Sequence, residues 1–323
     1  MRKSSVFVLV VFLGFLLASP AAADPVVLKM AHFLPLGTLD MVAWEAYVKA
    51  VNEKGKDIVE IKRVGGPEAI PSMKQFEALK NGVVDVIFVP ESYYGRQVTG
   101  AAYTHLSQLT PWEERERGYY DFRVELLKKH NVFYMGRPLF GTWFQFFTNK
   151  KVARPQEMKG QKIRVSDTYE AFAKALGCAP ITMPGKDVYT ALENGTVDGY
   201  AWSCLGNIQQ GWVEVCKYML EPRLFQMNVE ALMNWKAWEK LPENAKKLLV
   251  EEMKANEKQY AKVMTDLGEK EIVELQKKGQ TMIKFSPEDT KWFVDLAYKS
   301  QWDEVATHAP ELGPKLKEML TKK

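Results

Sequence analysis

The chain has 323 residues, of which 46% are hydrophobic and 26% charged, and its formal net charge at pH 7 is +4. A charge this close to neutral argues against a nucleic-acid partner, because such proteins usually carry a dense basic surface. A chain of this length is long enough to bury a large core and commonly divides into two lobes.

The first segment indicates export. Arg2 and Lys3 precede the apolar run VFVLVVFLGFLLA, which ends in the small residues SPAAA. This order predicts a secretory signal over 1–23, with cleavage after Ala23, and therefore a periplasmic protein. The alternative is a membrane anchor, but the run has 13 residues, whereas a helix needs about 20 to cross a bilayer.

Strands and helices alternate in the next segment. Strands are predicted at 26–33, 58–64 and 83–90, and helices at 40–54 and 72–80. Gly55 and Gly82 end the two helices. The order strand–helix–strand–helix–strand is typical of a mostly parallel sheet flanked by helices.

One phrase occurs twice along the chain. FEALKNGVVD at 76–85 matches YTALENGTVD at 189–198, an offset of 113 residues, which exceeds the roughly 20–50 residues of solenoid repeats. In each copy a glycine is expected to end the helix in the left-handed conformation, before a buried strand begins. We therefore predict two similar α/β lobes whose strands point their carboxyl ends at a shared cleft.

The C-terminal part is predicted to be helical. Residues 241–279 keep helical periodicity without an internal proline after Pro242. A helix approaching 35 residues would be about 50 Å long, longer than one lobe, so we expect it to lie across both. A second helix is expected to begin at Ser286, which has the character of a helix cap.

Enzyme and metal signatures are missing from the sequence. It contains no HExxH, GxSxG, P-loop or GxGxxG motif, and Cys178, Cys204 and Cys216 fit no zinc spacing. We therefore predict no catalytic residue, no cofactor and no metal. Cys204 and Cys216 could form one disulfide in an oxidising compartment, although spacing alone does not establish the geometry.

Arg164 is the leading candidate for ligand binding. It lies in the strand KIRV near the predicted cleft, and a guanidinium matches a carboxylate or sulfonate with two parallel hydrogen bonds. The alternative is that Arg164 is an ordinary surface arginine of this strand and contacts no ligand. His32, at the end of the first strand, is expected to face the cleft, where either a ligand contact or a structural role fits.

The blocks GQKIRVSD, LGCAPITMP and DVYTALENGTVDG resemble the central signature of the TRAP-type periplasmic solute-binding proteins, the DctP family. The resemblance covers nearly the whole chain after residue 23. It implies a two-lobe, Venus-flytrap α/β protein, with a long C-terminal helix spanning both lobes, that closes around an organic acid. It also implies delivery to a membrane permease of large and small subunits, and a role for Arg164 in holding the acidic group.

The domain boundaries expected from this resemblance leave 1–23 as the signal. Lobe I comprises 24–140 and about 228–267, lobe II comprises 141–227 and about 268–305, and 306–323 form a C-terminal helical tail. We expect a monomer.

Two positions depart from the family pattern. Members that bind polar acids often have a second arginine after Gly-Thr, where this chain has Trp143 and Phe144. An asparagine is common three residues after the VDG block, where this chain has Trp202. An aromatic wall suits a monocarboxylate with a compact, aromatic or indolyl body, whereas extra polar groups of a dicarboxylate or sialic acid would be buried unpaired at ~1–3 kcal/mol each.

Several alternatives remain open from the sequence. A small alkanesulfonate could replace the carboxylate, and Trp143 and Trp202 could pack against the hinge instead of the ligand. An enzyme on the same scaffold would use Glu68 or Asp198 as general base, and a membrane sensor could read the loaded protein. Further candidates for lining the site are Glu68, Tyr93, Tyr94 and Asn228.

Overall fold

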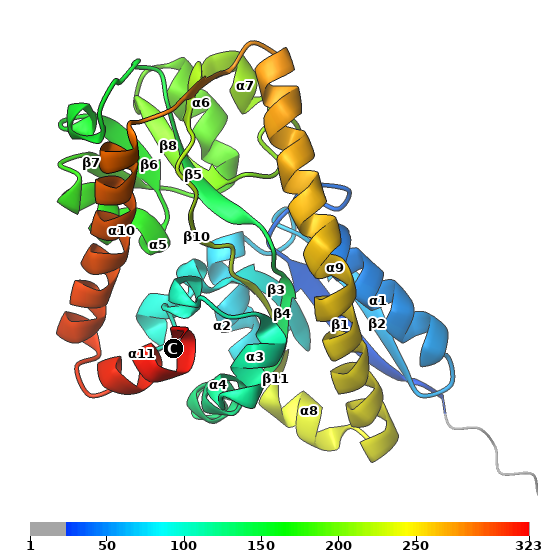
Figure 1. Cartoon of the computed structure of the whole chain (residues 1–323). Coiled ribbons are helices and arrows are strands. Elements are labelled where there is room, and N and C mark those ends of the chain that lie inside the picture. Colours follow the sequence, from blue (N-terminus) through cyan, green and yellow to red (C-terminus); the bar gives the residue numbers. More distant parts are fainter. Residues whose placement is uncertain (1–23, 323) are drawn as a thin grey trace, which may run out of the picture.

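The computed structural model describes residues 24–322, so the predicted signal over 1–23 lies outside the described part. Two α/β lobes are stacked along one long helix (Figure 1). This confirms the predicted fold class, including the long helix.

Lobe I contains a five-stranded sheet in the order β2-β1-β3-β11-β4. Its strands are β1 (Val26–His32), β2 (Val59–Gly65), β3 (Val86–Pro90), β4 (Val132–Leu139) and β11 (Val229–Asn234). Its helices are α1 (Val42–Lys54), α2 (Gln75–Lys80), α3 (Pro111–Glu116), α4 (Tyr119–Lys128) and α8 (Trp235–Lys240).

Lobe II contains a seven-stranded sheet in the order β12-β9-β5-β8-β6-β7, with β10 paired to β5. Its strands are β5 (Trp143–Thr148), β6 (Lys162–Val165), β7 (Ala179–Thr182), β8 (Gly199–Ser203), β9 (Tyr218–Leu220), β10 (Leu224–Gln226) and β12 (Thr281–Ile283). Its helices are α5 (Asp167–Ala175), α6 (Val188–Glu193) and α7 (Trp212–Val215).

Both sheets are mixed, whereas the sequence predicted mostly parallel ones. In lobe I, β11 is antiparallel to β3 and β4, and in lobe II, β5 is antiparallel to β8 and β9. The reason is topological: the chain crosses between the lobes after β4 and again after β10. Each crossing strand therefore enters the next sheet against the direction of its neighbours.

The repeated phrase has the same structural role in both lobes. Gly82 and Gly195 have φ angles of 73° and 72°, a left-handed conformation that a side chain would strain. Just beyond them, the Asp85 carboxylate accepts from the Lys29 N–H and the Asp198 carboxylate accepts from the Lys162 N–H, each at 2.8 Å. In each lobe the aspartate thus joins the start of the new strand to the strand beside it.

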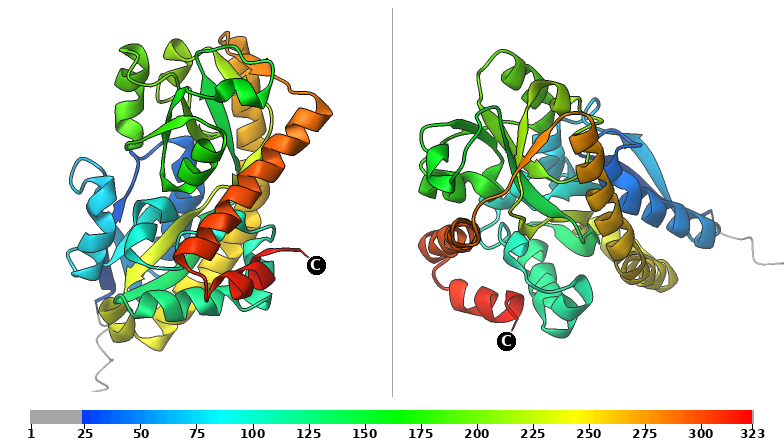
Figure 2. Two further views of the ribbon diagram at one scale, coloured as in Figure 1. Left: turned by 90° about the vertical axis from the view of Figure 1, so that its left-hand side faces the viewer. Right: turned by 45° about the horizontal axis from the view of Figure 1, so that its top comes forward.

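Three helices complete the structure. Helix α9 (Glu243–Lys277) packs against α1 and β4 of lobe I, and its Glu271 accepts from the Ile208 N–H of lobe II at 3.0 Å. Helix α10 (Pro287–His308) begins at the Ser286 cap, packs on α5 and leads to α11 (Gly313–Leu320), which packs on α4 (Figure 2). The two lobes are therefore joined by helices on two sides as well as by the crossing strands.

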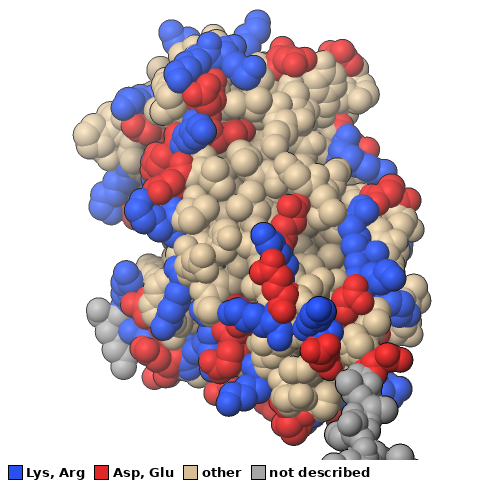
Figure 3. All heavy atoms as spheres, turned by 90° about the vertical axis from the view of Figure 1, so that its right-hand side faces the viewer, with Lys and Arg blue, Asp and Glu red and all other residues tan. Residues whose placement is uncertain are grey.

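The three cysteines are buried and free, so the disulfide considered between Cys204 and Cys216 does not form in the structure. Within residues 24–322, no helix has both the length and the apolar character to cross a membrane. Acidic and basic side chains are interspersed on the face where α9 lies (Figure 3).

Candidate functional site

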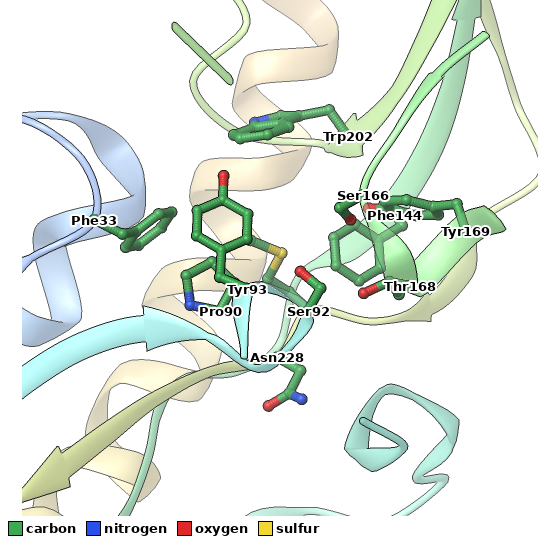
Figure 4. A pocket seen from close by; sticks show the side chains of 11 residues that line it. Phe33, Pro90, Ser92, Tyr93, Phe144, Ser166, Thr168, Tyr169, Trp202 and Asn228 are labelled. Carbon is green, nitrogen blue, oxygen red and sulfur yellow. The ribbon is translucent and has the colours of Figure 1, made fainter. Parts of the chain in front are cut away.

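A small cavity lies where the two lobes meet (Figure 4). Its volume is about 20 Å³, little more than the ~10–15 Å³ that one water molecule requires. Most of its walls come from residues that end or follow strands of both sheets, as expected for the carboxyl edge of an α/β sheet. The lining residues are Phe33, Pro90, Ser92, Tyr93, Phe144, Ser166, Thr168, Tyr169, Trp202, Met227 and Asn228.

Aromatic rings form much of this lining. Phe144 meets Tyr169 edge to face at 4.7 Å between ring centroids, and Phe33 meets Tyr93 in the same way at 6.2 Å. The Tyr93 ring reaches from lobe I toward the Trp202 indole of lobe II (Figure 4). Such walls suit a flat or apolar ligand body.

Arg164 lies in β6, fully buried, with its guanidinium carbon 4.8 Å from the centroid of the Trp202 ring. Its Nε and Nη2 donate to the Met183 carbonyl at 2.9 and 2.6 Å, and its Nη1 donates to the Ala201 carbonyl at 3.1 Å. A guanidinium has five N–H donors, so two bond no backbone carbonyl, and the Tyr93 hydroxyl lies within hydrogen-bonding reach of this group. Burial lowers the pKa of Arg164, an effect that the nearby Tyr93 and Tyr169 hydroxyls oppose.

Arg164 differs from the other two fully buried arginines of the described chain. Arg123 lies 2.7 Å from the Glu230 carboxylate, and Arg137 lies 2.6 Å from the Glu114 carboxylate. Within residues 24–322 no carboxylate lies within ion-pair distance of Arg164, although a buried charge is costly unless it is paired. The guanidinium is thus an unpaired cation beside an interlobe cavity.

Further polar atoms at the cavity lack partners. The Tyr169 hydroxyl, the Trp202 indole nitrogen and both amide atoms of Asn228 are buried without a hydrogen bond among the described residues. Buried polar groups rarely stay unpaired, so these atoms are available to a ligand. In Figure 4 the Tyr169 hydroxyl points to the same side as Ser166, whereas the Asn228 amide points away from the aromatic rings.

The structure brings together about half of the residues expected at the site. Tyr93, Phe144, Trp202 and Asn228 line the cavity, and Arg164 lies against the Trp202 ring. Trp143 does not line it. Its ring instead contacts the Arg223 guanidinium at 3.7 Å and lies against Gly268 of α9, where an added Cβ would be 3.2 Å from the indole.

His32 does not face the cavity. Its Nδ1 donates to the Leu34 carbonyl, and its Nε2 accepts from the Arg63 Nε at 2.7 Å. Burial lowers the pKa of His32, so the ring is neutral and both nitrogens are occupied. Glu68 is bound to the same Arg63 at 2.6 Å and to the Gly66 N–H at 2.8 Å, which gives it a role in the loop.

Tyr94 does not line the cavity. Its ring stacks on Phe76 at 4.3 Å, and its hydroxyl bonds the Glu230 carboxylate and accepts from Arg123 at 2.7 Å. Glu91, which is adjacent to the lining residues Pro90 and Ser92, belongs to the same buried network through the Thr104 N–H at 2.9 Å. This network holds the loop that presents Tyr93.

The two carboxylates considered as a general base lie apart from this cavity and are already engaged. Asp198 accepts from the Lys162 N–H and lies 3.0 Å from the Lys150 ammonium. Burial raises the pKa of Asp198, but these two partners outweigh it and the pKa lies below its usual range. Glu68 is held by Arg63, as described above.

Apart from Pro90 and Ser92, which belong to the same segment as Tyr93, five lining residues were not singled out from the sequence. Tyr169 and Thr168 lie in the first turn of α5, and Ser166 links that helix to β6. Their position directly after the strand of Arg164 is the signal that would have identified them. Phe33, next to His32, and Met227, next to Asn228, are neighbours of residues that were named.

The lobes also touch outside the cavity. Gln209 of lobe II accepts from the Leu39 N–H at 2.9 Å and donates to the Gly37 carbonyl at 3.2 Å. On another side, Arg96 of lobe I pairs with Asp167 and Glu170 at the start of α5. The cleft is therefore closed in this structure.

A family model described as bacterial extracellular solute-binding protein, family 7 (DctP), matches residues 30–308. The chain is 25% identical over 291 residues to the C4-dicarboxylate-binding periplasmic protein DctP of Rhodobacter capsulatus, covering 83% of each chain. It is 24% identical over 302 residues to a solute-binding protein of Albidiferax ferrireducens, covering 88% of each.

Solved structures share the fold. A TRAP periplasmic solute-binding protein from Desulfovibrio salexigens with bound orotic acid has a TM-score of 0.81 and 19% identity, covering 91% of this chain and 97% of that one. DctP7 of Bordetella pertussis, a receptor binding pyroglutamic acid, has a TM-score of 0.80 and 17% identity, covering 92% and 99%.

Proposed function

The chain belongs to the DctP family of bacterial extracellular solute-binding proteins, and we propose that it captures a small organic monoanion between its lobes in the periplasm. It delivers this anion to a TRAP-type membrane permease of large and small subunits. It acts as a monomer. It carries out no catalysis, because the carboxylates considered as bases are held in ion pairs away from the cavity.

The unpaired guanidinium of Arg164 is the observation that carries this proposal. Its two remaining N–H donors suit the parallel oxygens of a carboxylate, and an anion would neutralise the buried charge that no described carboxylate neutralises. Lobe closure removes the Arg164 guanidinium from water, and a bound anion neutralises its charge. Ligand binding and lobe closure would therefore stabilise each other.

The cavity lining favours one acidic group. No lysine or arginine is among the residues that line it, and Arg164, which lies behind the lining residue Trp202, is the one cation that the described residues place here, so a second carboxylate would be buried without a cation. The aromatic rings instead favour a monocarboxylate with an aromatic or indolyl body. Two relatives of the same fold bind cyclic carboxylates, orotic and pyroglutamic acid. A small alkanesulfonate is the alternative, because the same two N–H donors of Arg164 match two sulfonate oxygens.

Release of the bound molecule by denaturation, followed by mass spectrometry, identifies the substrate directly. Calorimetry with that acid then compares Arg164→Ala with Arg154→Ala, a control that removes an exposed arginine of the same lobe. Loss of a clamp on a desolvated anion costs ~2–5 kcal/mol, so we expect Arg164→Ala to weaken binding at least about thirtyfold. Unchanged affinity in Arg164→Ala would reject the proposal.

A further inference from the structure

A second, larger cavity adjoins the first. It has a volume of about 340 Å³ and shares Phe33 and Tyr93 with the small cavity as common walls. Its other walls come from lobe I, from the loop after β7 in lobe II and from the segment between β8 and α7. They are Leu34, Pro35, Pro67, Pro71, Ser72, Met73, Pro184, Gly185, Lys186, Asp187 and Gln210.

We propose that this outer cavity binds the apolar body of the substrate while its acidic group lies at Arg164. The substrate class is then an elongated monocarboxylate with an aryl or alkyl tail, and Tyr93 sets how thick that tail can be. This inference rests on the proposed function of Arg164.

The two volumes support this division of the ligand. The small cavity has room for about one water molecule, so it accommodates an oxygen of an acidic group but not an organic body. The outer cavity, at about 340 Å³, falls within the ~300–1,000 Å³ of ordinary small-molecule sites. A ligand longer than its acidic group therefore has space on this side.

The chain also connects Arg164 to the outer cavity directly. The Met183 carbonyl accepts from Arg164 at 2.9 and 2.6 Å, and the next residues, starting with Pro184, line the outer cavity. Gly185 lies against Trp202, where an added Cβ would be 2.8 Å from the indole. A tail that leaves the guanidinium between Tyr93 and this loop thus enters the outer cavity.

The walls of the outer cavity favour an apolar occupant. Four of them are prolines, which have no backbone N–H to donate, and Phe33, Leu34 and Met73 add apolar surface. The charged residues Lys186 and Asp187 carry opposite signs and are exposed, so they lie at the rim. Hydrogen bonding is thus concentrated at the Arg164 end.

Tyr93 separates the two cavities. It lines both, is only 8% exposed, and directs its hydroxyl toward Trp202 (Figure 4). A ligand that extends from one cavity into the other must pass beside this ring. The ring therefore limits the cross-section of the ligand rather than its length.

Calorimetry with a graded series of acids tests the inference: acetate, benzoate, phenylacetate, 3-phenylpropionate and 4-phenylbutyrate. Affinity is expected to rise about fourfold for each added methylene that is buried. Tyr93→Ala should improve the relative affinity for the thicker acid 3,3-diphenylpropionate. Equal affinity across the series would overturn the inference while leaving the proposed function intact, whereas no binding of any monoanion would overturn both.

A matched pair of variants locates the tail. Met73 is 37% exposed in the structure, and a bound tail would cover it. Met73→Asp therefore places a charge against the tail and is expected to weaken binding of 4-phenylbutyrate about tenfold. Val83→Asp makes the same change at an exposed valine of the same lobe, 58% exposed and outside both linings, and should leave the affinity unchanged. Equal effects of the two variants would show that the tail lies elsewhere.

Discussion

The Arg96 guanidinium lies 2.9 Å from the Asp167 carboxylate and so joins lobe I to the first turn of α5. The same guanidinium also pairs with Glu170, one turn further along that helix. Helix α5 carries Thr168 and Tyr169, which line the cavity. These ion pairs therefore hold a wall of the site against the opposite lobe.

We expect Arg96→Ala to weaken ligand binding only about 1.4- to fivefold, because the arginine is 68% exposed and exposed ion pairs contribute ~0.2–1 kcal/mol. The salt dependence of binding should also decrease. Calorimetry at low and high sodium chloride measures both effects. Lys174→Ala is the control, because Lys174 pairs with Glu170 within α5 and does not cross the cleft; an equal loss there would contradict a role in closure.

The sequence predicted the element order well because short-range signals control it. Hydrophobic periodicity located the strands and helices, and Gly82 and Gly195 adopt the left-handed conformation expected at both helix ends. The long helix followed from an unbroken pattern over 241–279. The antiparallel strands were missed because a crossing between lobes is set by packing of distant segments, which local patterns do not encode.

The site was only partly predictable, since adjacent residues can face opposite ways. Trp143 and Phe144 were both expected at the ligand, but consecutive side chains of a strand point to opposite faces. Phe144 lines the cavity and Trp143 faces α9. Tyr93 and Tyr94 lie at the end of a 3-10 helical turn instead of in a strand, and again only one of the two lines the cavity. For such pairs only the assembled lobes decide which member reaches the cleft.

Asp40 gives a prediction about pH. It is 1% exposed, its Oδ1 has no partner among the described residues, and it lies against Gly206 of lobe II. Burial raises the pKa of Asp40 to about 7, and the neighbouring Glu271 carboxylate adds to the shift. The folded protein therefore binds this proton more tightly than the unfolded chain, whose aspartates titrate near pH 4.

The free energy of unfolding should consequently fall as pH rises from about 4 to 7, by up to ~4 kcal/mol from this group. Asp40→Asn should remove that part of the slope and stabilise the protein at pH 8. Urea unfolding at pH 5 and pH 8 measures the difference between variant and parent. Asp198→Asn is the control: the pKa of Asp198 is lowered in the folded state, so the group is ionised at both pH values and its loss should change the stability equally at pH 5 and pH 8. A pH-dependent difference of the same size in both variants would contradict the assignment to Asp40.

The three cysteine thiols are expected to be unreactive in the folded protein. All three are buried and free, and burial raises the pKa of each thiol to about 12. A thiol reagent should therefore label none of them in the native state and all three after denaturation, because the thiolate is the reactive form. Labelling of only one after denaturation would indicate a disulfide, and reductant would then lower the melting temperature.

Two buried arginines should respond differently to the same substitution. Arg123 lies 2.7 Å from Glu230 and 3.7 Å from Glu91, so Arg123→Met leaves two buried carboxylates without their cation. We expect this change to cost ~3–5 kcal/mol of the free energy of unfolding.

Arg164→Met removes a cation that has no such partner. Two carbonyls lose a donor, at ~1–3 kcal/mol each, but the release of an unpaired buried charge offsets part of that cost, so the net loss of stability should be clearly smaller than for Arg123→Met. Ligand binding should instead be weakened more by Arg164→Met than by Arg123→Met, because of the two arginines only Arg164 contacts the cavity-lining Trp202 ring. Urea unfolding of the ligand-free proteins and calorimetry of binding test the two halves separately. If Arg164→Met unfolds as readily as Arg123→Met and still binds its acid, the guanidinium serves the fold and another group holds the anion.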